Sequence, residues 1–110
     1  MRRSFERGEP VETAEAHTIA DGIAIRVPIP DSLADMRGLV DEVHIVTDEQ
    51  IVEAMRLLFA HTGLLIEPAG AVGIAMLLAH RDKFTGQHLA TVLCGGNLTE
   101  KQIREWILPQ

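Results

Sequence analysis

Apolar residues recur at helical spacing in two parts of the chain, and each run begins with a capping sequence. Residues 47–50 (TDEQ) have the spacing of a capping box, and apolar residues follow three and four positions apart until Gly63. Residues 99–102 (TEKQ) form a second box. We therefore predict a helix from residue 48 to Gly63 and a last helix after Thr99. Its inward-facing residues are expected to be Ile103, Trp106 and Ile107.

A third helix is predicted at Ala69–His80, which is apolar on every side. Pro68 suits its first position because the missing N–H would be unpaired there. A helix without a polar face must be covered on several sides. Residues 43–46 and 88–93 are short apolar runs that indicate strands. Strands alternating with helices indicate an α/β fold with parallel pairing, so we expect this helix to pack on a sheet that holds both strands.

Composition and charge narrow the class of protein. The chain has 110 residues, about one domain's worth, and its 46% hydrophobic and 24% charged residues are typical of a globular protein. Residues 1–37 are interrupted by glycine and proline, which indicates a helix end and a long connection. The net charge of −6 has the wrong sign for a nucleic-acid partner. No apolar stretch has the length of a membrane span, so we predict a soluble, cytoplasmic protein.

Few residues could carry chemistry. Cys94 follows a predicted strand and precedes Gly95 and Gly96, where open α/β sheets contact their ligands. The alternatives are a small buried cysteine and an ordinary tight turn. For Glu67, before Pro68, the alternative to a functional role is a helix cap or a first-turn charge that favours the helix dipole. Acidic residues between 31 and 49 are interpreted as a solvated face. The histidines lack metal-binding spacing, so no metal site is predicted; they are His17, His44, His61, His80 and His88.

Three segments, taken in order and spacing, carry a family resemblance. Residues 17–22 (HTIADG), 66–71 (IEPAGA) and 92–97 (VLCGGN) resemble the C-terminal third of threonine and serine dehydratases and serine racemase. Residues 4–11 (SFERGEPV) resemble the helix end and loop that precede the first motif there. These enzymes are fold type II pyridoxal-phosphate enzymes, similar to the tryptophan synthase β chain. The resemblance implies a partial three-layer αβα unit with parallel strands and a central apolar helix. It also implies one domain over residues 1–110, the C-terminal part of a large domain truncated at its N-terminus.

The resemblance assigns roles to five residues. Cys94 would hydrogen-bond the pyridine nitrogen of pyridoxal 5'-phosphate. A weakly acidic thiol leaves that nitrogen unprotonated, which makes the ring a weaker electron sink and suits β-elimination. Glu67 would lie near the cofactor ring, and Gly95 and Gly96 would let the backbone approach it. Asp21 would lie toward the substrate cleft or the dimer interface.

Two family features have no counterpart in this sequence. Nothing resembles the S-x-K-x-R-G segment that supplies the Schiff-base lysine, or the four-glycine loop that holds the cofactor phosphate. Lys83 and Lys101 match no catalytic position, so no catalytic residue is assigned. The resemblance thus implies part of a threonine or serine ammonia-lyase, which releases a 2-oxo acid and ammonia.

Alone, this part is expected neither to be active nor to bind the cofactor stably. Its implied partners are the amino-acid substrate, a complementary N-terminal segment and further copies of itself. A non-catalytic oligomerisation or ligand-binding module derived from such an enzyme is the alternative. The sequence leaves open whether the substrate is threonine or serine, and whether the reaction is elimination or racemisation.

Overall fold

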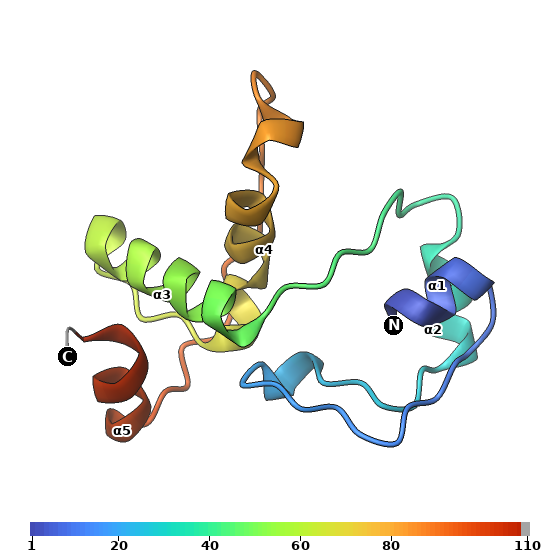
Figure 1. Cartoon of the computed structure of the whole chain (residues 1–110), viewed down its shortest axis with the longest axis horizontal. Coiled ribbons are helices and arrows are strands. Elements are labelled where there is room, and N and C mark those ends of the chain that lie inside the picture. Colours follow the sequence, from blue (N-terminus) through green and yellow to red (C-terminus); the bar gives the residue numbers. More distant parts are fainter. Residues whose placement is uncertain (109–110) are drawn as a thin grey trace.

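A computed structural model describes residues 1–108, in which all regular structure is helical (Figure 1). The predicted domain also includes residues 109 and 110, which lie outside the described residues. The longest helices are α3 (Asp48–Thr62) and α4 (Pro68–Ala79). The shorter elements are α1 (Arg2–Arg7), the 3₁₀ turn η1 (Asp21–Ile23), α2 (Pro30–Met36), the 3₁₀ turn η2 (Arg81–Phe84), α5 (Glu100–Gln102) and the π-helical turn η3 (Ile103–Ile107).

The predicted ends of α3 are confirmed. The Thr47 hydroxyl accepts a hydrogen bond from the Gln50 N–H at 3.3 Å, and the Gln50 side chain accepts one from the Thr47 N–H at 2.8 Å. Gly63 ends the helix with a φ of 72°, a left-handed conformation that glycine adopts without strain. Both ends follow from local sequence alone.

The last helix is also confirmed, although it is short. The Thr99 and Gln102 box is present, and α5 continues directly into η3. Ile107 is buried in the core against α3, and Trp106 is half-buried. The Arg56 guanidinium donates to the Trp106 carbonyl oxygen at 2.7 Å, and this hydrogen bond links η3 to α3.

Helix α4 begins at Pro68 as predicted and forms the core with α3. Ala71 and Ala75 on α4 are almost completely buried, as are Ile51 and Met55 on α3. Small residues on α4 let the two helices approach closely. The C-terminal end of α4 lies outside this core, and Leu78 at that end is 37% exposed.

The two predicted strands are wrong for the described residues. Residues 43–46 and 88–93 run as irregular connections, and residues 1–108 contain no strand and hence no parallel sheet. A strand exists only when a neighbour pairs with its backbone, and these segments find no such neighbour within the described chain. The layer expected to be a sheet against α4 is instead a single segment that runs beside the helix (Figure 1). A Cβ on Gly73 would lie 2.1 Å from the Thr91 hydroxyl oxygen of that segment.

The molecule is a flat and open slab. Its extents are 42 × 37 × 18 Å, and its radius of gyration is 15.1 Å, against about 13 Å for a compact chain of this length. Its accessible surface is 7866 Å², against roughly 6,000 Å² for a folded monomer of this mass. Large apolar side chains are exposed on it, among them Ile29, Leu39 and Val92 at 62%, 82% and 79%. No helix within the described residues combines the length and apolarity needed to cross a membrane.

Candidate functional site

The three motif segments meet around the N-terminal end of α4. The Glu67 N–H donates to the Gly95 carbonyl oxygen at 3.1 Å, which joins residues 66–71 to residues 92–97. A Cβ on Gly22 would lie 3.4 Å from the Ala69 Cβ, so η1 also rests on this end of the helix. Segments far apart in the sequence therefore form one local cluster.

The Glu67 side chain reaches the glycine turn. Glu67 is the N-cap residue of α4, as one interpretation predicted, but its side chain makes no capping hydrogen bond. Its Oε2 instead accepts a hydrogen bond from the Asn97 N–H at 3.1 Å. Gly95 has a φ of 74°, and a Cβ there would lie 2.2 Å from the Glu67 carboxyl carbon. The carboxylate therefore lies directly over a glycine that has no room for a side chain.

Cys94 is exposed and unpaired by any disulfide, so the interpretation as a small buried residue is wrong. Its backbone is closely packed all the same. A Cβ on Gly70 would lie 1.8 Å from the Cys94 carbonyl oxygen, so α4 approaches this backbone only because it has glycine there. The result is a fixed backbone that offers an accessible thiol, a weak hydrogen-bond donor.

A contact that sequence reasoning missed holds residues 18–20. The Asp48 carboxylate at the start of α3 accepts a hydrogen bond from the Thr18 hydroxyl at 2.6 Å and from the Ile19 N–H at 3.2 Å. The interpretation as a solvated acidic face is therefore wrong for Asp48. The local sequence holds no signal for this contact, because the partners lie 30 and 29 residues away. Asp21, next along the motif, is exposed at the start of η1.

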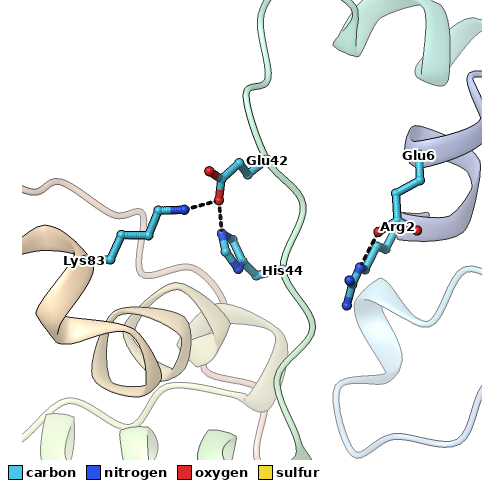
Figure 2. A network of polar contacts seen from close by, with 5 residues as sticks. All are labelled: Arg2, Glu6, Glu42, His44 and Lys83. Carbon is cyan, nitrogen blue, oxygen red and sulfur yellow. Dashed lines mark hydrogen bonds and ion pairs between the residues drawn. The ribbon is translucent and has the colours of Figure 1, made fainter.

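A second polar cluster lies near the opposite end of α4 (Figure 2). Glu42 hydrogen-bonds both the Lys83 ammonium and the His44 ring, the latter at 2.8 Å. The His44 and His80 rings lie with centroids 4.7 Å apart. The hydrogen bond from Lys83, and then that from His44, lowers the pKa of the Glu42 carboxyl. Lys83 is thus ion-paired away from the Cys94 turn. Within residues 1–108, no three His, Cys, Asp or Glu side chains gather as metal ligands would.

A hollow of about 760 Å³ lies between the 43–46 connection and α4. Its walls are largely apolar and include Val43, Ile45, Val72 and Met76. Thr18, from the first motif segment, also borders it. The hollow is therefore bordered by α4, by the 43–46 connection and by the N-terminal region, including Met1 and Val11.

Comparison with known proteins defines the class to which this cluster belongs. Residues 1–95 match the family described as pyridoxal-phosphate dependent enzyme, and the chain belongs to that family. It is 40% identical over 100 residues to the L-threonine ammonia-lyase of Geobacter sulfurreducens, across 91% of this chain and 25% of that protein.

Two solved structures resemble the chain closely. A threonine deaminase from T.th. has a TM-score of 0.82 and 34% identity over 89% of this chain and 35% of its own. Maize serine racemase has a TM-score of 0.82 and 27% identity over 94% of this chain and 33% of its own. The resemblance to threonine dehydratases and serine racemases is therefore confirmed, and these structures support the α/β fold class. The chain spans only about a quarter to a third of the length of these proteins.

Proposed function

We propose that this chain is the C-terminal part of the large domain of a pyridoxal-phosphate ammonia-lyase acting on threonine or serine. The observation that carries the proposal is the meeting of three motif segments at one end of α4, beside an exposed Cys94 thiol. The similarity to an L-threonine ammonia-lyase and a threonine deaminase supports the reaction class. In this proposal the chain supplies one wall of the cofactor site and is inactive alone.

The residues at the cluster fit a flat heteroaromatic cofactor. The Glu67 carboxyl group already fills the space where a Gly95 side chain would lie, so a ring would approach this turn on the side of the exposed Cys94 thiol. The exposed Cys94 thiol offers a weak donor to a ring nitrogen, and the cofactor supplies an electron sink when bound. Glu67 borders the same turn. Asp21 would face the substrate cleft or a neighbouring subunit.

Activity would need groups beyond this chain. Lys83 is ion-paired with Glu42 past the C-terminal end of α4, whereas the Cys94 turn lies at the other end of that helix. Lys101 is exposed on α5. An amine that binds a carbonyl cofactor must be desolvated or tuned by nearby charge, and neither lysine has that setting at the cluster. A complementary segment would therefore bring the lysine and the phosphate-binding loop.

The large exposed surface of this open slab favours the proposal of a complementary segment. The surface of the slab exceeds that of a compact monomer of this mass by roughly 1,900 Å², about twice the roughly 800 Å² that one partner buries in a standard protein interface. The apolar hollow beside α4 and the connections 43–46 and 88–93 would receive strands of the complementary segment. Further copies would complete a homo-oligomer.

Mixing the chain with a complementary upstream segment tests this proposal. We expect no release of 2-oxo acid from threonine or serine by the purified chain, and measurable release by the reconstituted pair. Turnover by the chain alone after repurification would overturn the claim that it is inactive alone. A folded, stably associated pair without cofactor binding would overturn the assignment as a lyase.

Substitutions of Cys94 in that reconstituted pair test the site. Cys94→Ser should retain most activity, because a hydroxyl offers a similar weakly acidic hydrogen bond. Cys94→Ala should lose about 1 to 3 kcal/mol of stabilisation by leaving the ring nitrogen without a partner. Cys94→Asp should lower elimination or raise transamination, because a carboxylate favours a protonated nitrogen. Equal activity and cofactor affinity in all four proteins would remove Cys94 from the site.

A non-catalytic oligomerisation module is the second candidate, favoured by the exposed apolar side chains on the slab. It predicts self-association that does not depend on a complementary segment. Analytical ultracentrifugation of the chain alone, compared with the mixture, separates the two proposals.

A further inference from the structure

We infer that Glu67 is a positioning residue: it fixes the turn of residues 94–97 and thereby sets the direction of the Cys94 thiol. The importance of that thiol rests on the proposed function. The contacts through which Glu67 holds this turn, called the Glu67 clamp below, all lie within this chain.

Glu67 holds the turn at two points. Its backbone N–H donates to the Gly95 carbonyl oxygen, and its side-chain Oε2 accepts from the Asn97 N–H, each at 3.1 Å. The side chain makes no capping bond to its own helix. The Glu67 carboxylate instead accepts its hydrogen bond from the turn at Asn97, 30 residues further along the chain. Such a bidentate link fixes both the position and the rotation of the turn relative to α4.

Steric contacts with the start of α4 add to these hydrogen bonds. The Glu67 carboxyl group occupies the space above Gly95, where a Cβ would lie 2.2 Å from the carboxyl carbon. The Gly70 backbone also lies so close to Cys94 that a Cβ there would be 1.8 Å from the Cys94 carbonyl oxygen. Because these residues hold the Cys94 backbone, the direction of the thiol varies only with the side-chain rotamer.

The chemistry of the two side chains separates their roles. An ionised carboxylate has only acceptors, and one Glu67 oxygen already accepts from the Asn97 N–H. It cannot donate to an unprotonated ring nitrogen, whereas a thiol can. Glu67 therefore acts through the turn, and Cys94 provides the contact.

The test compares Glu67→Ala and Glu67→Gln with the control Glu53→Ala, an exposed glutamate of α3. Amide hydrogen exchange at Asn97 and the rate at which a disulfide reagent modifies Cys94 are measured on the whole 110-residue chain. In Glu67→Ala, the Asn97 amide should exchange about tenfold faster, because the acceptor of its hydrogen bond is lost, and the thiol rate should change. Glu67→Gln should stay within about twofold of wild type, since its amide oxygen accepts the same bond. Glu53→Ala should behave as wild type.

Gly95→Ala is a second variant that does not remove the carboxylate. Its Cβ would push the Glu67 carboxyl aside, so it should also raise exchange at Asn97 with the helix content of α4 retained. Unchanged Asn97 exchange in both Glu67→Ala and Gly95→Ala would overturn the inference, as would a glutamine variant as impaired as the alanine variant. These measurements need no cofactor. Failure of the reconstituted pair to bind cofactor would thus reject the proposed function and leave the Glu67 clamp standing.

Discussion

Residues 1–40 and residues 47–108 are held together in different ways. In the first region, α1 and α2 lie outside the apolar core cluster and make polar contacts: the buried Ser4 hydroxyl accepts from the Val11 N–H at 2.9 Å, and Arg37 donates to the Gly8 carbonyl oxygen at 2.6 Å. In the second region, α3, α4 and η3 share an apolar core. Helices α1 and α2 lie apart from α3 and α4 in Figure 1, whereas Ala20 and η1 of the first region pack against the core.

The difference shows which region can be stable without a partner. Burial of apolar surface supplies most folding free energy, and exposed polar contacts add little. Ile23, Ile25 and Val27 in the first region are about half exposed, whereas Ile51 and Met55 in the second are at most 2% exposed. The first region therefore depends on whatever covers its apolar side chains.

Truncating one methionine in each region should separate them most clearly. Met55→Ala should cost about 2 to 5 kcal/mol in the free energy of unfolding, because the site is completely buried. Met36→Ala, at a half-buried position in α2, is the matched control and should cost under about 1 kcal/mol. Denaturant unfolding followed by circular dichroism measures both. Equal costs would show that the first region has a core of its own.

A glycine in each region gives the next largest contrast. Gly70→Ala should destabilise by about 1 to 3 kcal/mol, because its Cβ meets the Cys94 backbone. Gly22→Ala should be close to neutral, because its Cβ meets only the Ala69 Cβ, at 3.4 Å. Thermal unfolding of the two variants provides the comparison. A neutral Gly70→Ala would mean that residues 91–94 do not pack against α4.

The Asp48 link between the regions should have an intermediate effect. Asp48→Ala should cost about 1 to 2 kcal/mol, because it leaves the Thr18 hydroxyl and the Ile19 N–H without their acceptor. Exchange of the Ile19 amide should rise. The exposed Asp41 provides the control, and Asp41→Ala should leave that amide unchanged. Unaltered Ile19 exchange in Asp48→Ala would refute the link.

The smallest effect is expected at Glu42. Its lowered pKa, caused first by Lys83 and then by His44, means that its contribution is present at neutral pH. This contribution is lost as the pH falls through the lowered pKa. The difference in Tm between wild type and Glu42→Gln should therefore shrink toward zero in acid, and added salt should reduce it. Glu12→Gln, at an exposed position in the first region, is the control for the loss of one surface carboxylate.

Local features of the fold were predictable, and long-range ones were not. The Thr47 box, the stop at Gly63 and the start at Pro68 depend on neighbouring residues, and all are confirmed. The predicted strands at 43–46 and 88–93 are wrong because pairing needs a second segment at the right distance, which no local pattern supplies.

The same distinction applies to the candidate site. The motif order indicated the family correctly, since the motifs are local strings. The bonds from Glu67 to Asn97 and from Asp48 to Thr18 each join residues 30 positions apart, and only the folded chain reveals them. The roles of Cys94, Gly95, Gly96, Glu67 and Asp21 toward a cofactor or substrate stay predictions.

The unpaired segment beside α4 also has a consequence for the handling of this chain in solution. Residues 89–94 (LATVLC) carry no charge, proline or glycine, and Leu89 and Val92 are 48% and 79% exposed. Six-residue segments of this composition stack into cross-β fibrils when their backbone is free. Concentrated solutions of the chain should therefore form thioflavin-binding aggregates, and an added lysine in this segment should delay them. As long as its backbone is unpaired, this segment limits the concentration at which the chain stays dispersed.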